Sequence, residues 1–366
     1  MSAQTLAIAA QADLTTRKDF ELGYRPALDG VRGVAILAVL AVHTSHLFGW
    51  SLLKGGSIGV DIFFVLSGFL ITCILLEEWS GTGTINLRHF YARRFLRLVP
   101  ALLLLAVALL LLSGALFSVS EAAQTRRTLP IALLYLSDFF ASLAPQTSLG
   151  ALRHTWSLAI EEHFYLLWPP VLLFLLKRGR SRRGLLVLTS SLAVAVCLHR
   201  VLLFNGGASP ARTYFAFDAR ADALLIGCSA GMAVSWGFAQ SFNRLNTLAA
   251  LTLIILCLFA TNFASPLMHQ GGFTVLAAAT ALLLINLVSA QSVFFNKLME
   301  TSPLVWVGKI SYGLYLWHYP MFKWIKYASA PWPIKLGLAL LGTFAVASVS
   351  FYFVERPLLR LKRRFA

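Results

Sequence analysis

An arginine and a histidine lie on one apolar stretch near the start of the chain, GVRGVAILAVLAVH. Arg32 and His43 are eleven positions apart, which on an α-helix is about three turns and a rise of about 16 Å, so both point from one face. With Arg32 at the inner surface of a membrane, His43 lies about halfway across, where a neutral imidazole can act as a general base. The alternative is a buried histidine bonded to a neighbouring helix, with Arg32 as an ordinary anchor. The spacing is compatible with both.

Two adjacent carboxylates, Glu161 and Glu162, lie in the segment TWSLAIEEHFYLLWPP. A charged side chain inside a hydrocarbon core costs about 2.5 to 3.5 kcal/mol on insertion scales, so such a pair indicates a function. The two point about 100° apart on a helix, so at most one can face a given cavity and the other needs a separate partner. We expect them to belong to the site, in preference to a purely structural ion pair.

Three arginines, Arg93, Arg94 and Arg97, precede an apolar stretch in RHFYARRFLRLVP. Their spacing lets three guanidinium groups converge at one end of a helix. Arginine forks suit phosphate oxygens, so the cluster is a candidate site for a polyphosphorylated donor such as coenzyme A. The alternative, which composition alone favours, is the usual excess of basic residues on the cytoplasmic side, or contact with anionic lipid head groups.

Two further segments, GVDIFFVLSGFLIT and RADALLIG, carry polar residues. We interpret Asp61 as a helix N-cap. We interpret Ser67 as a packing contact rather than a nucleophile, because no nucleophile-elbow pattern surrounds it. Arg220 and Asp222 are two positions apart and cannot face each other on a helix, so each needs a partner elsewhere. We expect Arg220 to meet one of the glutamates of the EEH segment.

The segment SYGLYLWHYP contains Tyr315 and His318. Tyrosine and tryptophan are also typical of an interfacial aromatic belt, and we interpret His318 as a core histidine. We group these two with four other residues as a network that binds substrate or supports the fold: Asp61, Ser67, Arg220 and Asp222.

The elements that must position these residues are membrane-spanning helices. Of the 366 residues 58% are hydrophobic and 13% are charged, and the mean hydropathy is +0.73, whereas soluble domains are about 25% charged. The sequence predicts an all-α polytopic membrane protein with about ten spans of about 20 residues each. They lie near 33–50, 57–76, 98–118, 155–176, 184–204, 219–237, 246–263, 272–289, 303–326 and 334–354. The run 129–143 predicts a short re-entrant or interfacial helix.

The distribution of basic residues predicts the orientation. A net charge of +16 would also suit a nucleic-acid-binding protein, but about twenty bases fall on one set of loops against about six on the other, as the positive-inside rule describes. We therefore expect both termini in the cytoplasm and no nucleic-acid partner. The chain, 1–366, reads as one domain, with a cytoplasmic segment 1–32, a helical membrane core 33–354 and a basic cytoplasmic tail 355–366. The first apolar run reads as a retained helix.

The four cysteines predict neither a disulfide nor a metal site. Cys73, Cys197, Cys228 and Cys257 all fall inside predicted spans and have no CxxC spacing.

Taken together, these segments resemble the integral-membrane acyltransferase family 3, bacterial enzymes that O-acylate surface glycans and some secreted small molecules. The resembling segments, in family order, are Arg32 with His43, VDIFFVLSGFLI, RRFLRLVP, WSLAIEEHFYLLWP, RADALLIG, SYGLYLWHYP and the closing ERP. The motif arginine and histidine correspond to Arg32 and His43. Many relatives carry glutamine at the position of His163, a departure with no evident link to specificity.

The resemblance implies a ten-helix fold that takes an acyl group from cytoplasmic acyl-CoA, usually acetyl-CoA, and delivers it to an acceptor on or beyond the outer face. It implies His43 and Arg32 as catalytic residues, to which we add Glu161 and Glu162 as catalytic candidates from their charge within a predicted span, and we expect no permanently bound cofactor. Some relatives carry a C-terminal esterase-like domain, which this sequence lacks, so a separate extracytoplasmic acyltransferase is an expected partner for any second transfer step.

We therefore predict a multi-pass O-acyltransferase of the bacterial plasma (inner) membrane that acts on a cell-surface or exported carbohydrate such as lipopolysaccharide or another polysaccharide. The competing reading is a transporter or flippase for a glycan or lipid intermediate, because charges within the membrane also line transport paths. Paired half-repeats with broken helices would favour transport, and the sequence contains no internal repeat.

Overall fold

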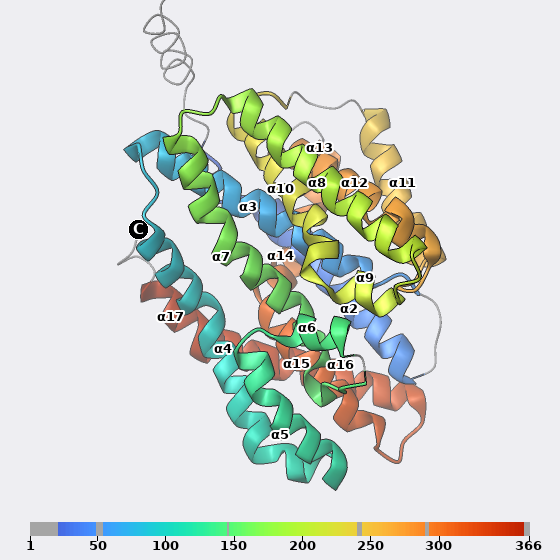
Figure 1. Cartoon of the computed structure of the whole chain (residues 1–366). Helices are drawn as coiled ribbons and strands as arrows, with labels where there is room; N and C mark the ends of the chain where they lie inside the picture. Colours follow the sequence, from blue (N-terminus) through green and yellow to red (C-terminus); the bar gives the residue numbers. More distant parts are fainter. Residues whose placement is uncertain (1–20, 49–53, 145, 240–243, 290–292, 362–366) are drawn as a thin grey trace, which may run out of the picture.

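The structure is a computed structural model that describes residues 21–48, 54–144, 146–239, 244–289 and 293–361. This part of the chain is built from helices, without a β-strand. In Figure 1, α4 runs down one side of the molecule, α5 turns back against it at the lower end, and α7 lies between α4 and α8.

The helices follow one another in a simple order. They are α2 (Pro26–Phe48), α3 (Ile58–Thr82), α4 (Leu87–Leu116), α5 (Val119–Leu133), α6 (Ser137–Leu143), η1 (Gly150–Thr155), α7 (Trp156–Lys177), α8 (Arg182–Asn205), α9 (Pro210–Phe215), α10 (Phe217–Ser235), α11 (Arg244–Ala260), η2 (Met268–Gly272), α12 (Phe273–Val288), α13 (Val293–Met299), α14 (Ser302–Lys309), α15 (Ser311–Lys326), α16 (Trp332–Ser350), η3 (Phe351–Glu355) and α17 (Arg356–Arg360).

Seven helical segments in the described residues are long and apolar enough to cross a membrane. They are Pro26–Ser45, Ile58–Thr82, Leu87–Leu116, Gly150–Lys177, Arg182–Asn205, Met268–Val288 and Trp332–Arg360. The other three predicted spans correspond to α10, which carries charges, to the shorter apolar stretch Leu245–Ala260, and to the region 303–326. The prediction of a multi-pass helical protein is therefore confirmed, whereas the count of ten is not.

Several predicted boundaries differ from the structure. The region 303–326 is divided into α14 and α15 at Ile310, so the prediction of one continuous helix was wrong. The run 129–143 contains the end of α5 and the whole of α6, separated where Tyr135 adopts a φ of 55°. Helix α2 begins inside the predicted terminal segment 1–32, and the tail is helical at α17, while 1–20 and 362–366 lie outside the described residues.

Glycines bring α3 and α10 into close contact. A Cβ atom at Gly68 would collide with the carbonyl oxygen of Leu224, and one at Gly227 would collide with that of Val65. Small residues at these two positions thus let the helix backbones approach closely. Because α3 bears Asp61 and Ser67, this packing fixes two of the predicted site residues.

Helix α2 is fixed against α14 in the same way. Gly33 faces the backbone of Leu304, and Gly308 faces the backbone of Asp29, each without room for a Cβ atom. This contact fixes the position of the helix that carries Arg32 and His43.

Candidate active site

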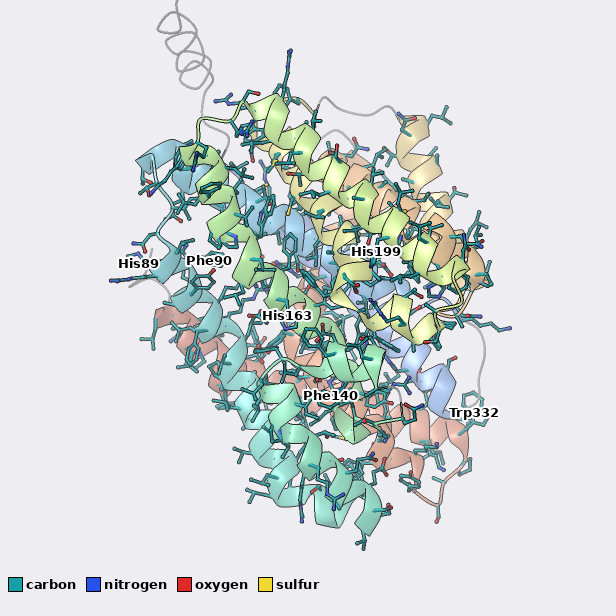
Figure 2. The ribbon with its side chains drawn as sticks, in the orientation of Figure 1. His89, Phe90, Phe140, His163, His199 and Trp332 are labelled. Atoms are coloured by element: carbon teal, nitrogen blue, oxygen red, sulfur yellow. The ribbon has the colours of Figure 1, made fainter. Side chains whose placement is uncertain are left out.

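A cavity of about 950 Å³ lies among α2, α3, α4, α7 and α15. Its lining runs from exposed residues of the α3–α4 connection, such as Thr84 and Asn86, to the buried Ser157 and Tyr315. Figure 2 shows His89, which also lines this cavity, at the edge of the molecule near the start of α4. The polar and charged residues of the lining are Arg32, Ser67, Glu77, Glu78, Thr82, Thr84, Asn86, His89, Arg93, Arg94, Arg97, Ser157, Glu161, Tyr165, Ser311, Tyr312 and Tyr315.

All three arginines of the RRFLR segment line this cavity. Helix α4 begins at Leu87 because the side chain of Asn86 accepts a hydrogen bond from the backbone N–H of His89. The arginines therefore lie in its first turns. The guanidinium of Arg94 lies 3.4 Å from the ring centroid of Tyr165, and Arg93 forms an ion pair of 3.4 Å with Glu78. The expected convergence of guanidinium groups is present, and it is directed at an open space.

The two adjacent glutamates of α7 have different surroundings. Glu161 lines the cavity, and its Oε1 accepts a 2.7 Å hydrogen bond from the hydroxyl of Ser67. Glu162 is absent from the lining, and its Oε1 is buried without a hydrogen-bond partner in the described part of the chain. The expectation that only one of them faces a given cavity therefore agrees with the structure. Ser67 is therefore more than a packing contact, because its hydroxyl bonds this carboxylate, and the bond agrees with its place in the polar network.

Arg32 and His43 are placed differently with respect to the cavity. Arg32 lines it and is held by Asp29, with 2.6 Å between Nη1 and Oδ1. His43 is half-buried further along α2 and is not part of the lining. Of the two residues, only Arg32 therefore belongs to the cavity lining.

Ser157 and Tyr315 are buried residues of the cavity lining. The hydroxyl of Tyr315 donates a 2.7 Å hydrogen bond to the carbonyl oxygen of His154 and accepts one of 2.5 Å from the hydroxyl of Ser157. The ring of Tyr315 also lies 5.5 Å, between centroids, from each of the rings of His154 and His318. Tyr315 thus contacts the cavity on one side and a group of histidines on the other.

Three histidines and a tyrosine form this group, which we call the histidine cluster: His43, His154, His318 and Tyr319. The ring centroids of His43 and His318 are 4.9 Å apart, those of His154 and His318 are 5.2 Å apart, and Tyr319 lies 5.4 Å from both His43 and His154. His318 is fully buried, as expected for a core histidine, but it also contacts the catalytic candidate. The sequence reasoning missed His154, which lies one position before the predicted span 155–176.

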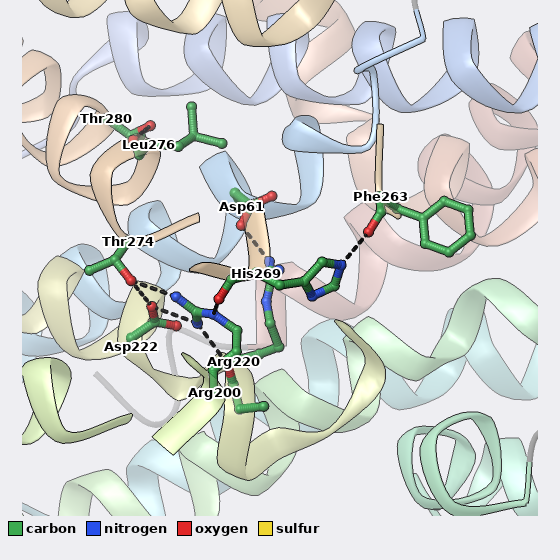
Figure 3. A network of polar contacts seen from close by, with 10 residues as sticks. Asp61, Arg200, Arg220, Asp222, Phe263, His269, Thr274, Leu276 and Thr280 are labelled. Carbon is green, nitrogen blue, oxygen red and sulfur yellow. Dashed lines mark hydrogen bonds and ion pairs between the residues drawn. The ribbon is translucent and has the colours of Figure 1, made fainter. Parts of the chain in front are cut away.

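A second group of polar residues, drawn in Figure 3, is not part of the cavity lining. Arg220 forms a buried ion pair with Asp61 of α3, and its guanidinium lies 4.0 Å from the ring centroid of Phe273. Helix α3 is preceded by Ser57, without a side-chain cap, so the interpretation of Asp61 as an N-cap was wrong. The expected pairing of Arg220 with a glutamate was also wrong, because Asp61 lies nearer on the packed face between α3 and α10.

Asp222 has its partner on α8, as its spacing from Arg220 required. Arg200 donates to Asp222 at 2.8 Å and to the hydroxyl of Thr274 at 2.6 Å, and that hydroxyl donates to Asp222 at 2.6 Å. Arg200 is fully buried. Its position inside the predicted span 184–204 was the signal that could have identified it. The group joins α3, α8, α10 and α12.

His163 contacts a buried acid on α6. Its Nδ1 lies 3.4 Å from Oδ2 of Asp138, which is 1% exposed. Its ring also lies 5.3 Å from that of Phe139, between centroids, near the middle of the molecule in Figure 2. The residue that departs from the family pattern is therefore part of the packing between α6 and α7.

The cavity brings two kinds of group near each other. Its lining includes the three arginines of α4 and Tyr315, and Tyr315 contacts the histidine cluster. Guanidinium groups bind phosphates in forked hydrogen bonds, and neutral imidazoles accept protons from hydroxyls.

Curated relatives match most of the chain. It is 36% identical to a peptidoglycan O-acetyltransferase, OatA, of Listeria monocytogenes, over 94% of the chain and 57% of that protein. It is 35% identical to a putative peptidoglycan O-acetyltransferase, YrhL, of Bacillus subtilis, over 92% and 55%, and 32% identical to the O-acetyltransferase OatA of Staphylococcus aureus, over 92% and 57%. The chain thus spans between 55% and 57% of the length of these relatives. No solved structure matches it.

The family model described as an acyltransferase domain matches residues 25–355, a range that contains the cavity-lining arginines, the glutamates and the histidine cluster. By this match, the chain belongs to the acyltransferase-domain family of membrane proteins.

Proposed function

We propose that this protein is a membrane O-acyltransferase that takes an acetyl or other short acyl group from acyl-CoA and transfers it to a hydroxyl of a cell-envelope carbohydrate. The observation that carries the proposal is one cavity whose lining includes both the three arginines of α4 and Tyr315, the tyrosine in contact with the histidine cluster. We place the protein in the bacterial plasma membrane.

The arginine cluster is the proposed binding site for the coenzyme A phosphates. In the predicted orientation, the α3–α4 connection faces the cytoplasm, where acyl-CoA is available. Arg93, Arg94 and Arg97 lie near that opening, on a helix whose start is fixed by the Asn86 cap. A cluster serving only membrane orientation or lipid head groups would have no reason to line a cavity.

His43 is the proposed general base. It would accept the proton of the acceptor hydroxyl as that oxygen attacks the thioester carbonyl carbon, and such positioned proton transfer contributes about 10² to 10⁴ in rate. Arg32 and Glu161 line the cavity and would orient the donor. Glu162, whose Oε1 atom is buried, is outside the cavity lining and would act on the site through its charge, without touching the donor.

The names of the relatives favour a peptidoglycan sugar as the first acceptor to test. Two of them are described as acting on peptidoglycan, and a lipopolysaccharide or exopolysaccharide acceptor would place the reacting hydroxyl at the same cluster. For a polymer far from the membrane, a separate extracytoplasmic acyltransferase would carry out the second transfer.

The test uses the purified full chain in liposomes with acetyl-CoA labelled in the acetyl group, with and without soluble peptidoglycan fragments. We expect thioester consumption and label on the fragments, with acetyl-pantetheine a much poorer donor because it lacks the phosphates that arginines bind. Protein-free liposomes are the control. An intact thioester together with movement of glycan across the bilayer would instead indicate a transporter.

A further inference from the structure

His318 is held in one protonation form by its own helix. Its Nδ1 lies 2.7 Å from the carbonyl oxygen of Tyr315 and 3.2 Å from that of Leu314. Backbone carbonyl oxygens only accept hydrogen bonds, so Nδ1 must carry a proton. A neutral imidazole has one N–H, which leaves the lone pair of His318 on Nε2. Nε2 of His318 is therefore a hydrogen-bond acceptor.

The neighbour of this acceptor atom is His43. Its Nδ1 is 3.3 Å from Nε2 of His318 and 3.0 Å from the carbonyl oxygen of Val39, one turn earlier on α2. Both of these groups are acceptors, so Nδ1 of His43 must be the donor, with its hydrogen shared between them. A protonated Nε2 on His318 would place two N–H groups against each other, so the neutral form of His318 is the one that satisfies these four contacts.

We propose that His318 is a positioning residue that holds His43 in the tautomer protonated at Nδ1, so that Nε2 carries the lone pair that reacts. This inference deepens the proposed function and rests on His43 being its base. Nε2 of His43 accepts the proton of the acceptor hydroxyl while the oxygen forms the ester bond with the acyl carbon. The carbon–sulfur bond breaks, and the departing sulfur of coenzyme A takes up that proton.

The neighbouring histidine has a different role, which makes the assignment specific. Nε2 of His154 lies 3.1 Å from the carbonyl oxygen of Leu316, so that nitrogen carries its proton. His154 contacts His318 through ring packing, with centroids 5.2 Å apart. The hydrogen bond that Nδ1 of His43 donates goes to His318, whereas His154 meets His318 by ring packing.

Two substitutions at position 318 separate orientation from packing. In His318→Gln, the amide oxygen can occupy the place of Nε2 and accept from His43, whereas His318→Met fills similar space with a very weak acceptor. We expect the methionine variant to lose about tenfold in kcat for acetyl-CoA consumption, with KM unchanged, since a typical hydrogen bond contributes about this factor. The glutamine variant should recover to within about threefold of wild type.

The control is His199→Gln, an exposed histidine paired with Asp218 and remote from the cavity lining. It should keep wild-type kcat and KM. Wild-type kcat in His318→Met would overturn the proposal while leaving the proposed function intact. Absence of any acetyl-CoA consumption by the wild type would instead contradict the proposed function.

A spectroscopic measurement tests the tautomer without turnover. The full chain, labelled with ¹⁵N-histidine and reconstituted in lipid nanodiscs, gives separate signals for protonated and unprotonated ring nitrogens, and the His43 pair is identified by its loss in His43→Gln. We expect a protonated Nδ1 and an unprotonated Nε2 in the wild type. The reverse assignment would overturn the proposal even if the methionine variant fails to fold.

Discussion

The hydroxyl of Ser67 donates a 2.7 Å hydrogen bond to Oε1 of Glu161, joining α3 to α7 across 94 positions of sequence. Glu161 faces the cavity that also contains the three arginines. The bond fixes the direction of its carboxylate, so a residue that reads as a packing contact helps to shape the proposed donor site.

Replacing Ser67 by alanine should destabilise the protein by about 1 to 2 kcal/mol, because a part-buried carboxylate oxygen loses its donor. The midpoint of thermal unfolding in detergent should fall accordingly. Ser80→Ala is the matched control, since its exposed hydroxyl bonds only the backbone oxygen of Glu77. Equal midpoints for the two variants would contradict the role given to this bond.

Replacing Arg97 by alanine should raise KM for acetyl-CoA about 10- to 100-fold, the value of a charge-assisted hydrogen bond to phosphate. The effect should vanish with acetyl-pantetheine, which has no phosphate. Arg88→Ala is the control, because Arg88 lies on the same helix but is exposed and outside the lining. If both variants change KM alike, the cluster serves the membrane surface and not the donor.

Replacing Asp61 by asparagine should destabilise the protein by about 3 to 5 kcal/mol, because it leaves the fully buried Arg220 without its counter-charge. Asp218→Asn, which breaks the half-exposed pair with Arg212, should cost at most about 1 kcal/mol. The stability of the two variants is compared by the fraction of protein that remains monodisperse after heating. A similar loss of stability in both variants would show that burial does not determine how much each ion pair contributes to stability.

Replacing Gly68 by alanine should prevent normal packing of α3 on α10, because the added methyl group meets the backbone at Leu224. The yield of folded protein in the membrane fraction should drop sharply. Gly337→Ala, in α16 with nothing near its Cβ position, should leave that yield unchanged or slightly higher. A wild-type yield for Gly68→Ala would mean that the two helices can separate at little cost.

The sequence was sufficient for features that depend on one helix alone. The divergence of Glu161 and Glu162, the convergence of the arginines on α4 and the separate partners of Arg220 and Asp222 all follow from helical spacing. These features are local, so they required no knowledge of which helices are neighbours.

Contacts between helices could not be predicted from the sequence, because they depend on which helices are neighbours. The bond from Ser67 to Glu161 and the pair of Arg220 with Asp61 join helices whose adjacency no pattern specifies. His154 lies one position before the predicted span 155–176. It was therefore not counted among the ionisable residues inside the membrane. The break at Ile310 was hidden as well, because α14 and α15 are both apolar.

The central claim is that His43 is the base in acyl transfer from acetyl-CoA. The most direct test is the single-turnover rate of acetyl transfer by purified His43→Ala, measured at matched protein abundance and saturating acetyl-CoA. The account predicts a rate at least about 100-fold below wild type with donor binding retained. A near wild-type rate in this variant would contradict it.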